Sequence, residues 1–101
     1  MARFLITYYT GDMPQDPQSI AQTRRALIQW AAKTGEALAD LGAPIRSTTT
    51  ISSDGIHDGI SAGPFMGWSV IEAEDSSKAI RLMQDHPFIS RGGILQLSEP
   101  V

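Results

Sequence analysis

The sequence predicts an α+β fold whose elements follow the order strand, helix, strand, strand, helix, strand. Segments 4–9 and 65–73 are rich in β-branched, aromatic and other apolar residues, a composition that favours strands, in which successive side chains point to opposite faces of a sheet. Segments 20–41 and 76–86 repeat apolar residues every three or four positions, which is the period of an amphipathic helix. At 101 residues, we expect a single domain (1–101) with one core.

The composition narrows the classes of function. A net charge of −3 and a pI near 5.1 argue against nucleic-acid binding, which needs a cationic surface. The absence of cysteine excludes disulfides and thiolate chemistry. The chain begins without a basic segment followed by an apolar run, and no apolar run approaches the roughly 20 residues of a membrane span. We therefore expect a cytoplasmic protein that works without a membrane, a cofactor or a metal.

The first strand and the first helix are read from their apolar patterns. Phe4, Ile6 and Tyr8 share one face of the strand, and the intervening residues are also largely apolar. Ser19 followed by Gln22 fits a capping box, a pairing of side chains with free amides at a helix start.

The first helix is expected to run from about Ile20 to Leu41. Its apolar stripe and its polar stripe remain well separated over about six turns. Gly42 would then cap its C-terminus, and Pro44 would prevent its continuation.

The middle of the chain is more polar. Ile45 to Ser52 alternates apolar with polar residues and predicts a strand near a sheet edge. Asp54-Gly55 and Asp58-Gly59 are turn dipeptides, so 53–62 is expected to be a hairpin connection or a mobile loop. Gly63-Pro64 then predicts a chain reversal that leads into the strand at 65–73.

The second half predicts a strand, a helix and a final strand. Met66, Trp68 and Val70 fall on one face of strand 65–73, while Ile71 and Ala73 fall on the other.

A helix should follow this strand, capped by Asp75 or Ser76 and ended near His86 by Pro87. A short strand at 94–97 would complete the order.

Two helices and four antiparallel strands in this order form a ferredoxin-like arrangement. Two helices can cover only one face of the sheet, whereas both faces of the long strands carry apolar groups. A monomer would expose the second face as a large apolar patch. We therefore expect a homodimer in which the second face closes against a second copy, giving a dimeric α+β barrel.

Several short motifs, taken in order and spacing, resemble the YCII-related (DGPF-domain) family of small dimeric α+β barrel proteins. These motifs are Trp30, Leu41-Gly42-Ala43-Pro44, Gly63-Pro64-Phe65, Gly67-Trp68-Ser69, Ala73 and His86-Pro87. The resemblance covers most of the chain and implies the barrel fold, but most members of the family have no assigned activity. In the YCII branch, a histidine on the first helix and an aspartate just before the proline that follows the second helix form a proposed active-site pair. This chain has no histidine on its first helix and has His86 before Pro87, and Ala62 replaces the aspartate of the DGPF motif.

His86 is the candidate catalytic residue. Histidine can act as an acid, a base or a ligand near neutral pH, and His86 falls on the inward stripe of the second helix. The alternative is a structural histidine that bonds to carbonyls in the last helical turn.

Four aromatic residues are candidate walls of a pocket for a flat or apolar ligand. They are Tyr8, Phe65, Trp30 and Trp68. Packing in the core or at a dimer interface explains such residues equally well. His57 with Asp54 and Asp58 could in principle hold a metal, but aspartates beside glycines more often form turns.

Two hypotheses of function follow. The first is a small-molecule-binding dimer that carries out a simple acid–base step in the barrel cleft through His86. The second is a non-catalytic interaction module that dimerises through its sheet face. A barrel interior filled by Phe4, Met66 and Trp68, with no cavity, would favour the second.

Overall fold

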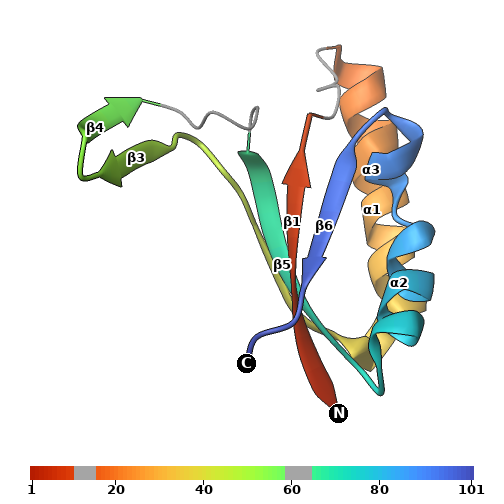
Figure 1. Cartoon of the computed structure of the whole chain (residues 1–101). Coiled ribbons are helices and arrows are strands. Elements are labelled where there is room, and N and C mark those ends of the chain that lie inside the picture. The colour runs from red at the N-terminus through yellow and green to blue at the C-terminus, as the bar shows by residue number, and fades with distance from the viewer. Residues whose placement is uncertain (11–15, 59–64) are drawn as a thin grey trace.

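The computed structural model describes residues 1–10, 16–58 and 65–101 (Figure 1). In chain order the elements are β1 (Ala2–Tyr9), α1 (Pro17–Thr34), the 3-10 turn η1 (Gly35–Ala37), β2 (Leu38–Pro44), β3 (Thr49–Ser52), β4 (Gly55–Asp58), β5 (Phe65–Ala73), α2 (Ser76–Gln84), α3 (Pro87–Ser90) and β6 (Ile94–Ser98).

Four strands form one antiparallel sheet in the order β2-β5-β1-β6. Helices α1, α2 and α3 lie together on one face of this sheet (Figure 1). The architecture is thus α+β and is compatible with the expected ferredoxin-like fold, in which each crossover places its helix on the same face. Strands β3 and β4 form a separate two-stranded sheet.

The core lies between the sheet and the helices. Phe4, Ile6 and Ile71 are its largest fully buried side chains, and Ala79 and Met83 of α2 pack over them. Phe4 therefore faces the helices. The expectation that Phe4 would fill a barrel interior together with Trp68 is wrong, because Phe4 pairs in register with Ile71 and shares its face of the sheet.

Helix α1 differs from its predicted bounds at both ends. Its N-cap is Asp16, whose carboxylate accepts the Ser19 amide at 2.9 Å, so Ser19 lies inside the helix rather than capping it. The helix ends at Thr34 because Gly35 takes a positive φ of 63° and its amide bonds back to the Ala31 carbonyl.

The residues predicted to form the last turn of that helix form strand β2 instead. Leu38 pairs with Ile71 of β5 and turns toward the core cluster. Gly42 is not a helix cap but lies within β2, where it takes a φ of 73°. A Cβ at this position would lie 1.8 Å from the Trp68 carbonyl oxygen, so β2 approaches β5 too closely for any side chain there.

The strand predicted at Ile45 to Ser52 is also corrected. The strand that joins the main sheet is β2, which ends at Pro44. Of the predicted segment, only Thr49–Ser52 forms a strand, and it pairs with Gly55–Asp58. A turn at Ser53 and Asp54 joins these two strands, but the loop predicted over 53–62 is wrong at Gly55–Asp58, which form strand β4. Gly59 and Gly63-Pro64 lie outside the described residues.

The second half of the chain follows its prediction. Strand β5 spans the predicted residues, and Asp75 caps α2 by accepting the Lys78 amide at 2.9 Å. Helix α2 ends before Pro87, as predicted, but His86 and Pro87 also open the short helix α3. Strand β6 extends one residue beyond the predicted 94–97.

Candidate functional site

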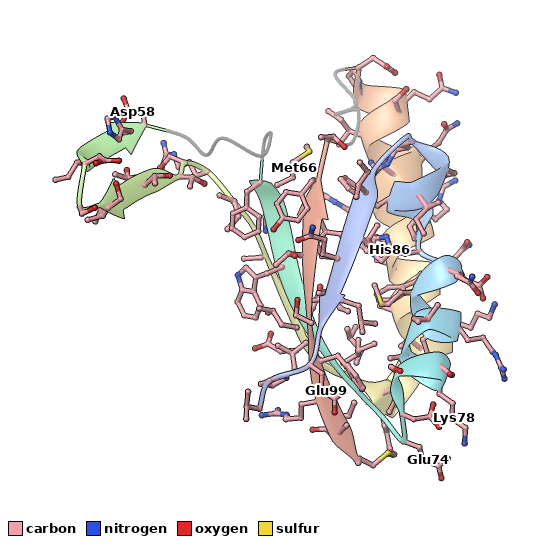
Figure 2. All side chains as sticks on the ribbon, in the orientation of Figure 1. Asp58, Met66, Glu74, Lys78, His86 and Glu99 are labelled. Atoms are coloured by element: carbon pink, nitrogen blue, oxygen red, sulfur yellow. The ribbon has the colours of Figure 1, made fainter. Side chains whose placement is uncertain are left out.

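The fold brings three of the predicted site residues together behind the sheet. The imidazole of His86 lies 4.4 Å from the Trp30 ring of α1 and 5.0 Å from the Tyr8 ring of β1, measured between ring centroids. Phe88 of α3 completes the cluster, 5.5 Å from Tyr8 in an edge-on arrangement. Figure 2 shows His86 on the helix side of the sheet.

His86 is committed to this cluster by its contacts. Its Nδ1 accepts the amide proton of Phe88 at 3.0 Å, which caps α3 and leaves the proton of the neutral ring on Nε2. Burial, together with the nearby positive charge of Arg91, lowers the pKa of His86 to about 4. The ring is consequently uncharged at neutral pH, where it can form hydrogen bonds but does not carry an extra proton to donate as an acid.

Tyr8 is held by a chain of hydrogen bonds across three strands. Ser69 donates its hydroxyl proton to the Leu41 carbonyl at 2.8 Å, so its oxygen accepts from the Tyr8 hydroxyl at 2.8 Å. Burial raises the pKa of Tyr8, because an apolar environment disfavours the phenolate.

Ser69 was missed as a partner of this tyrosine. The available signal was its position two residues before Ile71 on β5, since residues two apart on a strand share a face and Ser69 is therefore on the buried one.

Trp30 forms a wall between the aromatic cluster and an open groove. Its indole nitrogen donates to the Leu82 carbonyl at 3.3 Å. The groove, of about 570 Å³, runs between α1 and α2 over Ala73 and Met1. Charged side chains surround it, among them the exposed Lys33–Asp85 ion pair at 3.0 Å.

The other two aromatic candidates lie elsewhere. Trp68 lies three positions before Ile71 on β5, so the two side chains point to opposite faces of the sheet. Trp68, which pairs with Thr7, is therefore on the face that the helices leave uncovered. Phe65 lies at the start of β5, with its ring 5.6 Å from that of Tyr9. The four predicted ligand-binding residues therefore do not converge on one pocket.

The uncovered sheet face carries a cross-strand row of mixed chemistry. Trp68 of β5 lies opposite Thr7 of β1, which in turn lies opposite Gln96 of β6. Leu5, 42 % exposed, and Ile94, 55 % exposed, flank this row. An aromatic ring, a hydroxyl and an amide thus lie side by side in an apolar surround, which is the composition of small-molecule sites.

Within the described ranges, no group of three histidine, aspartate or glutamate side chains is arranged to hold a metal ion, and His57 with Asp54 and Asp58 is no exception. None of the described helices is long and apolar enough to span a membrane.

Comparison with known protein families finds no family model that matches this sequence, and comparison with curated proteins finds no match either.

Proposed function

We propose that the protein is a homodimeric α+β barrel, related to the YCII-type dimers it resembles, which binds a small, flat molecule between its two sheets in the cytoplasm. The observation that carries the proposal is the amount of surface left open. The chain exposes 7083 Å², whereas a compact monomer of 10.9 kDa exposes about 5,600 Å². The excess of about 1,500 Å² exceeds the roughly 800 Å² that each partner buries in a standard stable interface.

The uncovered face has the composition that such an interface needs. Leu5, Val70 and Trp68 are apolar, and the charged pair Arg3–Glu72, joined at 3.1 Å, lies at one end of the same face. An apolar centre with charges at its margin is the usual anatomy of a protein interface. Two such faces packed together would bury the apolar centre and would enclose the polar groups of Thr7 and Gln96 between the two sheets.

These two polar groups define the ligand we expect. Trp68 offers a flat surface for stacking, while the hydroxyl and the amide can each both donate and accept a hydrogen bond. The row itself contains no charged residue, so the matching ligand is an uncharged planar molecule with polar edges.

The geometry gives His86 a structural part in this proposal. It lies on the opposite side of the sheet from Trp68, its Nδ1 is occupied by the Phe88 amide, and its ring is neutral at pH 7. An acid–base step at His86 stays a prediction that the contacts of this residue do not favour.

The test is a comparison of two charge insertions at apolar positions. Val70→Arg places a charge in the uncovered face, whereas Ile28→Arg places one at a 61 % exposed position on α1. We expect wild type and Ile28→Arg to be dimers in native mass spectrometry and light scattering, and Val70→Arg to be a folded monomer. A wild-type protein that is monodisperse as a monomer at micromolar concentration would overturn the proposal.

The second candidate function is a non-catalytic assembly module. The observation that favours it is the size of Trp68, Leu5 and Ile94, which could fill the space between two sheets. Native mass spectra of freshly purified protein distinguish the two functions. Extra mass on the wild-type dimer, lost in Gln96→Leu, supports the binding protein; a dimer without extra mass supports the assembly module.

A further inference from the structure

The β3–β4 hairpin is the least supported part of the described fold. Among the residues that the structure describes, its two strands form a ladder with each other and with no further strand, and seven of its eight strand residues are exposed. It extends away from the main sheet on the side opposite the helices (Figure 1). An isolated two-stranded hairpin is marginally stable in water, so this hairpin requires a surface to pack against.

One face of the hairpin is suited to such packing. Ile51 and Ile56 lie directly opposite each other, 75 % and 71 % exposed. The Thr49–Asp58 pair shares this face at the end away from the turn, and the opposite face carries Ser52 and His57. A cross-strand isoleucine pair of this kind stabilises a hairpin only modestly unless it is also covered.

We infer that each hairpin is an arm that packs its Ile51–Ile56 face on the second copy of the chain. The inference rests on the proposed dimer and adds a second contact to it. Because the arm extends on the side of the uncovered sheet face, a partner packed on that face would come within its reach (Figure 1). The arm is thereby continuous with the proposed interface.

The shape of the chain supports the same reading. Its Cα atoms span 43 × 41 × 19 Å with a radius of gyration of 14.7 Å, whereas a compact chain of this length has about 13 Å. A thin, wide protomer with a projecting arm leaves the large excess of surface described above. Clasping a second copy would bury both the sheet face and the arm.

The absence of cysteine makes a direct test practical, because any cysteine introduced is the only labelling site. A nitroxide is attached at Ser53→Cys, in the turn of the arm, and the labelled protein is mixed with unlabelled, ¹⁵N-enriched chain. A second sample carries the nitroxide at Gln29→Cys on the exposed side of α1. Only contacts between copies can broaden the ¹⁵N signals in either sample.

We expect the arm label to broaden amide signals from β1, β5 or β6 of the enriched copy and the α1 label to leave them sharp. Equal signals in the two samples, with dimers present, would overturn the arm and leave the dimer standing. A wild-type monomer would overturn both.

A substitution test is independent of the label. Ile51→Ser with Ile56→Ser should raise the dimer Kd at least tenfold, because two apolar side chains lose their cover. The matched control, Ser52→Ala with His57→Ser on the opposite face, should change the Kd by less than twofold. Equal Kd values for both double variants and the wild type would overturn the arm. Val70→Arg reports separately on the sheet face.

Discussion

His86 joins two helices and an aromatic cluster through one ring. It follows the end of α2, its Nδ1 caps α3, and its ring contacts Trp30 and Tyr8. Each of these contacts is made by the neutral imidazole, because a protonated Nδ1 could not accept the Phe88 amide. The stability of the fold therefore depends on His86 remaining uncharged.

Acid should destabilise the protein through His86. The unfolded chain takes up a proton at this residue near pH 6.5, but the folded chain does so only near pH 4. The unfolded state thus binds more protons between these values, and the free energy of unfolding falls as the pH decreases from 7 to 4, by up to about 3 kcal/mol from this residue. Denaturant titrations at pH 7 and pH 4.5 measure the loss.

His86→Asn is the matched control, because its amide oxygen can still cap α3 but does not titrate. The difference in unfolding free energy between wild type and His86→Asn should shrink with rising acidity. An imidazole that titrates near pH 6.5 in NMR spectra would contradict the assignment.

The Tyr8–Ser69 pair should respond unequally to loss of either partner. Tyr8→Phe removes one donor and leaves the Ser69–Leu41 bond intact, at a cost of about 1 kcal/mol. Ser69→Ala leaves the buried Tyr8 hydroxyl without its acceptor and the Leu41 carbonyl without that donor, so we expect about 2–3 kcal/mol. Thermal or urea unfolding of the two variants and the double variant measures the coupling. Equal losses would mean that the hydroxyl finds another partner.

The sequence pattern predicted which aromatic and titratable residues face inward, but it did not predict which of them contact one another. The burial of His86 confirms that it faces inward, but the residue lies beyond the end of α2 and not on the apolar stripe of that helix as predicted. The separation of Trp68 from Tyr8 depends on the register that places Thr7, and not Tyr8, opposite Trp68. A shift of one residue would exchange the faces, and nothing local in either strand specifies that choice.

At the scale of elements, β1, β5, α2 and β6 were predictable because each has an apolar period that agrees with its neighbours. The end of α1 was not, because Leu38 and Leu41 continue the helical period past Gly35. Pairing of Leu38 with Ile71 in the sheet outweighs that local preference. The hairpin at 49–58 was read partly as a sheet strand because a polar alternating strand looks the same in either place.

Two glycines of positive φ provide a matched pair at this scale. Gly42→Ala meets the Trp68 carbonyl and must push β2 away from β5, so we expect a loss of at least 3 kcal/mol. Gly35→Ala has open space around its Cβ and costs only the backbone strain of its positive φ, about 1–3 kcal/mol, without the clash that Gly42→Ala adds. Chemical unfolding of both variants tests the difference. Equal costs would mean that β2 can move away from β5 without loss.

For the whole molecule, the placement of the helices on one face of an antiparallel sheet was predictable from the order of helices and strands along the chain. The dimer remains a prediction at this scale, because a single chain specifies an open face but not what closes it. The unusually large exposed area is a property of the folded chain that composition does not reveal, since an extended arm and a folded-back arm have the same residues.

The two outer strands of the main sheet differ in a way that bears on fibril formation. Strand β2 has register shifts on both sides of Asp40 and a left-handed glycine at its centre, whereas β6 pairs regularly over its full length. A free strand from a damaged chain needs an even row of amides and carbonyls to attach. The irregular backbone of β2 does not offer such a row. Its main-chain geometry, and not its charge, therefore protects this edge of the sheet against the addition of further strands.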